Sequence, residues 1–171
     1  VLYLVDACQS LGQYPIDVAA IQCDMLSATG RKYMRGPRGT GFLYVRSVAL
    51  PQLVPQWVDL HSATWTSPTS YTIRETARKF ENWESNYGSI YAFGIAVDYI
   101  LALGVDRIWE RVQYLGNYLR AMLSDMRYVQ VHDIGACKSG IVSFTVMGHS
   151  ASDVKNYLHE RNINISVSKR S

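Results

Sequence analysis

Lys32 is the side chain in this sequence that is best placed to do covalent chemistry. It lies in a loop rich in glycine and arginine, within residues 27–46, and small hydroxyl residues come just before it. Three further cations, Arg31, Arg35 and Arg38, crowd it. Like charges at close range favour the neutral amine, which is the form of lysine that attacks a carbonyl. The loop therefore indicates a carbonyl-reactive lysine.

The same loop also carries the groups that bind a phosphate. Backbone N–H groups, hydroxyls and guanidinium forks would all serve as donors. A carbonyl-reactive lysine beside a phosphate site suggests pyridoxal phosphate as the cofactor. Taken alone, however, the loop favours a simpler interpretation, a basic surface turn of the kind that can also contact nucleic acid.

Two extended segments hold the loop in place. Residues 23–28 predict a short strand before it, and residues 42–45, with their aromatic and β-branched side chains, predict a buried strand after it. The sequence therefore places Lys32 on a turn between two strands.

A second group of candidate residues follows the apolar run at residues 1–5. This run predicts a parallel strand buried on both faces, and Asp6 stands at its carboxyl end, where open α/β sheets bind their ligands. Gln9 lies in the turn that follows. The structural alternatives are a helix cap for Asp6 and an exposed polar residue for Gln9. Because a domain rarely begins on a central strand, we expect the chain to be a fragment of a longer protein.

The composition is that of an ordinary globular protein. The 171 residues are 48% hydrophobic and 18% charged, and the net charge is only +3, without a tract of basic residues. No apolar run approaches the roughly 20 residues that span a bilayer. The three cysteines, Cys8, Cys23 and Cys137, have no metal-like spacing, and neither do His132, His149 and His159. We interpret the cysteines as reduced packing residues of a cytoplasmic protein and expect no metal site.

The segments between the lysine loop and Gly88 predict mostly loops. Residues 47–60 indicate a loop with a short helical piece, and residues 61–73, rich in Ser and Thr, indicate a surface loop or an active-site lid. Residues 80–88 combine aromatic and polar side chains around Trp83, which is typical of an interface or a pocket wall.

The remaining chain predicts a small α+β domain. We expect helices from Ser89 to Gly104, from a cap at Asp106, and from a cap at Ser152 or Asp153, with strands at residues 128–131, 140–147 and 162–167. The predicted domain boundary lies near Gly88, which gives domains of residues 1–88 and 89–171.

Taken together, Asp6, Gln9, Thr29, Arg31 and Lys32 resemble a known family. The Asp-x-x-Gln turn followed by the Thr-Gly-Arg-Lys loop is similar to the class V aminotransferases, which are pyridoxal-phosphate enzymes of fold type I. That family includes cysteine desulfurases, C–S lyases and isopenicillin N epimerase-like proteins. The segments at residues 80–81, 89–104 and 140–149 also resemble its C-terminal half. The resemblance implies an α/β fold: the C-terminal part of the large cofactor domain followed by a truncated small α+β domain.

The resemblance gives each candidate residue a role. Lys32 would form the Schiff base with pyridoxal phosphate, and Asp6 would pair with the pyridinium nitrogen, so that the ring acts as an electron sink. Gln9 would bind the phenolic oxygen of the cofactor. Thr29 would bind the phosphate, and so would Arg31, which stands where many family members carry a histidine.

Two departures from the family bear on the reaction. Residues 82–86, Asn-Trp-Glu-Ser-Asn, replace a Gly-Thr pair whose threonine reaches the partner subunit's phosphate in many desulfurases. Residues 168–171 lack the cysteine that forms a persulfide in desulfurases. Both departures favour lyase or epimerase-like chemistry over desulfuration.

These features predict an enzyme that acts at Cα or Cβ of an amino acid, by lyase, epimerase-like or aminotransferase chemistry. The resemblance also implies a homodimer with an amino-acid substrate and with neither nucleic acid nor membrane as a partner. The alternative is a non-catalytic homologue or fragment that serves in association. A third interpretation, nucleic-acid binding through residues 31–38, has only charge to support it.

Overall fold

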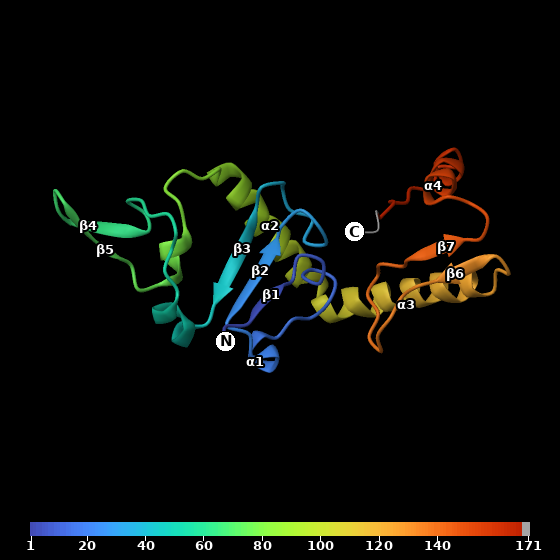
Figure 1. The fold of residues 1–171 in the computed structure, drawn as a ribbon, viewed down its shortest axis with the longest axis horizontal. Helices are drawn as coiled ribbons and strands as arrows, with labels where there is room; N and C mark the ends of the chain where they lie inside the picture. The colour runs from blue at the N-terminus through green and yellow to red at the C-terminus, as the bar shows by residue number, and fades with distance from the viewer. Residues whose placement is uncertain (169–171) are drawn as a thin grey trace. The chain divides into compact units, whose positions relative to one another are not determined.

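The computed structural model describes residues 1–168. Two compact units, Val1–Ile108 and Trp109–Ser171, make up the chain (Figure 1). The boundary predicted near Gly88 falls instead in the first turn of a helix of the first unit. The predicted boundary separates the large cofactor domain from the small domain of the family, which is a different division from that into compact units, and it stays a prediction.

The first unit is built around a mixed three-stranded sheet. Its elements are β1 Leu4–Asp6, α1 Val18–Ile21, β2 Met25–Thr29, β3 Gly41–Val45, η1 Ser47–Gln52, β4 Ala63–Ser67, β5 Ser70–Ile73, η2 Ala77–Phe80 and α2 Tyr87–Leu103. The strand order is β1-β2-β3, with β1 parallel and β3 antiparallel to β2. The register pairs Asp6 with Ser27. Asp6 and the loop after β2 therefore meet at one edge of the sheet, as the sequence predicts.

The core of this unit lies beneath the β1–β2 pair. It consists of buried Ala7, Cys23, Leu26 and Ala28, with partly buried Val5, Leu11, Ile16, Val18 and Tyr44 packed around them. The short helix α1 begins at Asp17, whose carboxylate accepts the N–H of Ala19 at 2.8 Å. This cap fixes the chain that returns from β1 to β2.

The two outer strands are more exposed than the sequence predicts. Leu4 in β1 is 55% exposed, and Phe42 and Leu43 in β3 are 42% and 40% exposed. Within the described residues both strands are edge strands, and only β2 has a neighbour on each side. The apolar pattern thus identifies the strands correctly, but the predicted burial of both is wrong for this chain.

Residues 63–73 form a β-hairpin, so the prediction of an irregular surface loop is wrong, and the alternative role as an active-site lid stays a prediction. Strands β4 and β5 pair antiparallel, with Trp65 opposite Tyr71. Aromatic and β-branched residues favour the extended backbone and outweigh the serines and prolines that suggest a loop. The helical piece predicted in residues 47–60 is present as η1.

Helix α2 confirms the predicted apolar helix and begins slightly earlier. Its N-cap is Asn86, whose side chain accepts the N–H of Ser89 at 3.0 Å, and its C-cap is Gly104 at φ +84°. A positive φ is the conformation that glycine adopts without strain, so it ends the helix cleanly.

The second unit has the predicted α+β composition. Helix α3, Val105–Ser124, starts at the end of the first unit and continues into the second, which also contains β6 Val129–Val131, β7 Phe144–Val146 and α4 Ala151–His159. Asp106 lies inside the first turn of α3, so it is not the cap. Ser150 caps α4 by accepting the N–H of Asp153, which replaces the predicted caps. The strand predicted at residues 162–167 is absent from the described part of the chain.

None of the described helices is by itself long and apolar enough to cross a membrane, although α2 and α3 taken together pass that test as a bent pair.

Candidate active site

Asp6 and Cys8 form the first part of the site, at the carboxyl end of β1. The Asp6 carboxylate accepts the backbone N–H of Cys8 at 2.9 Å. A hydrogen bond from the Cys8 thiol and this N–H bond lower the pKa of Asp6 below its ordinary value and outweigh desolvation, which raises it; the charge of Lys32 adds a smaller lowering effect. The carboxylate is therefore ionised at neutral pH.

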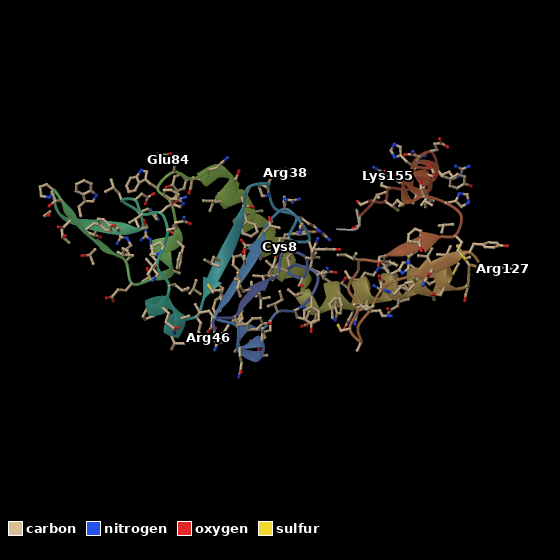
Figure 2. All side chains as sticks on the ribbon, viewed as in Figure 1. Cys8, Arg38, Arg46, Glu84, Arg127 and Lys155 are labelled. Carbon is tan, nitrogen blue, oxygen red and sulfur yellow. The ribbon has the colours of Figure 1, made fainter. Side chains whose placement is uncertain are left out.

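Cys8 is part of the site and not the packing residue that the sequence suggests. Its hydrogen bond to the Asp6 carboxylate raises the pKa of the thiol. A thiol that stays protonated is a poor nucleophile but a steady hydrogen-bond donor. Figure 2 labels Cys8 just after β1, and Arg38 in the loop that follows β2. The predicted packing role holds for Cys23, which is fully buried, and not for Cys137, which is exposed.

Lys32 lies in a loop that is closed on itself by backbone hydrogen bonds. The N–H of Arg35 donates to the Lys32 carbonyl at 2.9 Å, and the N–H of Gly36 donates to the Gly30 carbonyl at 2.7 Å. Lys32 is half-buried. Its charge makes only the smallest contribution to the pKa shifts of Asp6 and Cys8. The parallel register, however, pairs Asp6 with Ser27 in the strand that leads into the loop. The structure therefore brings together the lysine and the carboxylate that the sequence singles out.

Thr29 ends β2 directly before this loop. Its hydroxyl donates to the Thr40 carbonyl at 3.4 Å, and the N–H of Gly30 donates to the same oxygen at 2.8 Å. Arg31 follows and is exposed. The hydroxyl and the backbone N–H therefore both bond the Thr40 carbonyl in this structure, while Arg31 presents an exposed guanidinium to an anion. The phosphate contacts of Thr29 and Arg31 stay predictions.

The other two arginines of the loop differ in their surroundings. The guanidinium of Arg35 lies over the ring of Tyr99 in α2, 5.8 Å from its centroid, and Arg35 adopts φ +59°. Arg38 is exposed. Arg35 thus contributes a cation–π contact that ties the lysine loop to α2.

Helix α2 supports the lysine loop, and the sequence gives no sign of this contact. A Cβ at Gly30 or Gly36 would lie 2.8 Å or 2.7 Å from the ring of Phe93. Both glycines are therefore needed for the loop to lie this close to the helix. Phe93 belongs to the predicted apolar helix, but only the three-dimensional structure shows which of its side chains contacts the loop.

A pocket of about 420 Å³ borders the far end of the loop. Its lining includes Gly39, Thr40, Gly41, His61, Glu81, Asn82, Ser85, Tyr87, Ile90 and Phe93. The His61 Nε2 lies 2.8 Å from a Glu81 carboxylate oxygen, and Asp59 accepts the N–H of Trp83 at 2.6 Å. The segment around Trp83 is thus a pocket wall, which is one of its two predicted roles.

The chain matches the family model for class-V aminotransferases over residues 1–170. The protein belongs to that family. Among curated relatives it is 31% identical over 159 residues to a probable cysteine desulfurase of Methanothermobacter thermautotrophicus, covering 93% of this chain and 40% of that protein. A cysteine desulfurase of Salmonella agona is also 31% identical, with 91% and 38% covered. The chain therefore spans about 40% of the length of these relatives.

Solved structures confirm the predicted fold of this class-V aminotransferase chain. The apo cysteine desulfurase of Thermococcus onnurineus superimposes with a TM-score of 0.88 at 26% identity, covering 96% of this chain and 41% of that one. The cystine C–S lyase C-DES, in complex with cysteine persulfide, gives a TM-score of 0.81 at 26% identity, with 91% and 42% covered. The chain is therefore part of the fold of the pyridoxal-phosphate-dependent cysteine desulfurases.

Proposed function

We propose that this chain carries the cofactor-binding lysine of a pyridoxal-phosphate-dependent enzyme that acts at Cα or Cβ of an amino acid. The observation that carries the proposal is the parallel pairing of β1 with β2, which puts Asp6 opposite Ser27 and so places the carboxylate at the same end of the sheet as the loop that carries Lys32. Membership of the class-V aminotransferases supports it. Because the relatives are longer, the activity belongs to the full-length protein.

The residues present fit this cofactor in their chemistry. Asp6 offers an ionised carboxylate for a protonated ring nitrogen, and Gln9 offers an exposed amide for a phenolic oxygen. Arg31 offers an exposed guanidinium for a phosphate, and the Thr29 hydroxyl would join it by exchanging its bond to the Thr40 carbonyl. Lys32 offers an amine for a carbonyl carbon. Each donor or acceptor of pyridoxal phosphate thus has a counterpart in the segments β1, β2 and the loops that follow them.

When bound, pyridoxal phosphate supplies an electron sink that stabilises negative charge at the substrate's Cα. Asp6 would keep the proton on the ring nitrogen, because hydrogen bonds and the charge of Lys32 hold the carboxylate in its ionised form. Lys32 would hold the cofactor covalently through Nζ. Once the substrate has taken its place, the same Nζ is a free amine that can remove the Cα proton and return it.

We further propose a sulfur-containing amino acid as substrate, with cleavage of its Cβ–S bond without a persulfide on Cys8 or Cys23. The curated relatives are desulfurases, and C-DES is a cystine C–S lyase. Cys8 donates to Asp6 and Cys23 is buried, so neither has the reactive thiolate of a sulfur acceptor. A desulfurase cysteine is expected within residues 168–171. Of these positions, 169–171 lie outside the residues that the structure describes.

Absorbance spectroscopy of the full-length protein with added pyridoxal phosphate tests the cofactor. We expect a visible band that is absent in Lys32→Ala and that borohydride removes in the wild type. Lys155→Ala, at an exposed lysine of α4, is the control and should keep the band. Equal spectra for wild type and Lys32→Ala would overturn the proposal of a pyridoxal-phosphate enzyme and would favour the alternative, a non-catalytic role in association.

Product analysis with L-cysteine and L-cystine then tests the reaction. A C–S lyase releases ammonia and a 2-keto acid, whereas a desulfurase releases alanine. We expect keto acid, with alanine below a tenth of it. Alanine as the main product would contradict the lyase proposal while leaving the cofactor proposal intact. A homodimeric state and a cytoplasmic location stay predictions, and sedimentation of the full-length protein tests the first.

A further inference from the structure

The turn after β1 contains a buried glutamine that the mechanism above does not use. Gln13 is only 1% exposed, and its Nε2 donates to the backbone carbonyl of Gln9 at 2.6 Å. A glutamine is seldom buried this deeply unless its hydrogen bonds are needed there. Gln9 itself is exposed, so its side chain is open to a ligand while its backbone is held from below.

The residue before Gln13 fixes this turn to the lysine loop. Gly12 adopts φ +88°, and a Cβ there would lie 2.6 Å from the carbonyl carbon of Tyr33 and 2.7 Å from the nitrogen of Met34. Only a glycine allows two backbones to approach this closely in that conformation. Since Tyr33 follows Lys32 directly, Gly12 and Gln13 lie where the two cofactor-binding segments touch.

The turn is closed on its other side by two helix-like hydrogen bonds. The N–H of Leu11 donates to the Ala7 carbonyl at 2.9 Å, and the N–H of Tyr14 donates to the Ser10 carbonyl at 2.9 Å. The Gln13 side chain spans the remaining gap to Gln9. Loss of its N–H donor would leave the Gln9 carbonyl without that bond and would free the turn to shift.

We propose that Gln13 is a positioning residue of the cofactor site, whose buried amide holds the backbone of Gln9 in the turn that Gly12 packs against the lysine loop, so that the Gln9 side chain faces the cofactor's phenolic oxygen. This inference rests on the proposed function, because it assumes pyridoxal phosphate as the ligand of Gln9. In this proposal Gln13 touches no reacting atom and acts through Gln9.

Gln13→Met in the full-length protein tests the proposal, because methionine has a similar length and lacks the N–H donor. Gln52→Met, at an exposed glutamine of η1, is the matched control. We expect the dissociation constant for pyridoxal phosphate to rise about three- to tenfold in Gln13→Met and to stay unchanged in the control, as for the loss of one hydrogen bond. The maximum of the visible band should shift in the same direction as in Gln9→Ala.

A double-mutant cycle separates positioning from a general structural effect. If Gln13 acts through Gln9, Gln13→Met should weaken binding no further in a Gln9→Ala background. Additive losses, or a Gln13→Met protein that binds like Gln52→Met, would overturn the inference while the cofactor proposal stands. A wild-type protein without a Lys32-dependent band would overturn both.

Hydrogen exchange of the cofactor-free protein gives an independent measurement. We expect faster exchange in Gln13→Met for the amides of Leu11 and Tyr14 and unchanged exchange in β2 and β3. Faster exchange throughout β2 and β3 would show a loss of folding and would contradict a local positioning role.

Discussion

Hydrogen bonds between neighbours set the charge state of Asp6. The Cys8 thiol and N–H both donate to the carboxylate, and Lys32 adds its charge, so the pKa of Asp6 lies below its ordinary value. We predict that Cys8→Ala raises this pKa, because it removes the thiol donor, while Cys137→Ala does not. The side-chain carboxyl signal of Asp6, followed by NMR as a function of pH, measures the shift.

The direction of this effect fixes its consequence for the cofactor. A carboxylate with a lowered pKa holds a protonated ring nitrogen down to a more acidic pH. In Cys8→Ala the loss of bound cofactor on acidification should therefore begin at higher pH than in the wild type. If the pH at which cofactor is lost and the Asp6 titration are both the same in Cys8→Ala and in the wild type, the thiol does not act on Asp6.

At the scale of single residues, the sequence identifies the side chains that could react or bind a cofactor, but not the neighbouring residues that hold them by hydrogen bonds. Asp6 and Lys32 can be chosen because a carboxylate after a buried strand and a lysine in a glycine-rich loop have few other uses together. Cys8 and Gln13 cannot, because a cysteine and a glutamine in a turn carry no periodicity and no motif. Their roles depend on contacts with Asp6 and Gln9 that only the folded turn creates.

Contact between the lysine loop and α2 determines how firmly Lys32 is held. A Cβ at Gly36 would lie 2.7 Å from the ring of Phe93, so Gly36→Ala forces the loop or the ring to move. We predict a loss of about 1–3 kcal/mol in the free energy of unfolding, as for an overpacked core site. Chemical denaturation of the full-length protein measures it.

Replacing the Phe93 ring with a smaller side chain tests this explanation of the Gly36→Ala effect. Phe93→Leu should remove most of the clash, so the double variant should lose less than the sum of the two single losses. Gly94→Ala on the same helix has open space around its Cβ and should be neutral or slightly stabilising, since alanine favours helices by up to about 1 kcal/mol over glycine. Strict additivity of Gly36→Ala and Phe93→Leu would mean that the ring does not support the loop.

At the scale of elements, periodicity predicts the helices and fails where the pattern is ambiguous. The apolar run of α2 and its end at Gly104 follow from composition and from the conformational freedom of glycine. The hairpin of β4 and β5 is missed because Ser, Thr and Pro suggest a loop, while cross-strand pairs such as Trp65–Tyr71 are invisible in a single strand. The burial of β1 and β3 is overestimated, because an apolar run predicts a buried strand but does not say which segments cover it. Among the described residues, β1 and β3 are the outer strands of the sheet.

At the scale of the whole molecule, family membership and fold are predictable, but the division into compact units is not. The combination of Asp6, Gln9 and Lys32 is specific enough to indicate the class-V aminotransferase family. The unit boundary after Ile108 depends on how α3 shares its contacts, and helix periodicity carries no information on that. The two units should therefore be compared by stability measurements on the intact protein.

A buried ion pair holds the second unit together. The Arg120 Nε lies 2.7 Å from an Asp133 carboxylate oxygen, and both side chains are less than 10% exposed. The Arg120 guanidinium also donates to the carbonyls of Ser139 and Ile141 at 2.6 and 2.9 Å, while Asp133 accepts the N–H and hydroxyl of Ser143. The pair thus joins α3 to the segments on either side of residues 134–140. Removing one partner leaves a buried charge alone, so Arg120→Met should cost about 3–5 kcal/mol.

The pKa of Asp133 gives this unit a defined response to acid. Burial tends to raise that pKa, but hydrogen bonds from Ser143 and the Arg120 guanidinium outweigh it, so the pKa lies below the ordinary value of 3.8. A carboxyl with a lowered pKa in the folded state stabilises that state above its unfolded pKa and loses this effect as the pH falls through the folded value. Below about pH 4, the protection factors of the amides in β6 and β7, which correct for the intrinsic effect of pH on exchange, should therefore fall in the wild type, and they should fall less in Asp133→Asn. Lys155→Met, at an exposed lysine of α4 in the same unit, should change the free energy of unfolding by no more than about 0.5 kcal/mol and is the control for the buried pair. An acid response that is identical in wild type and Asp133→Asn would assign it to another carboxyl group.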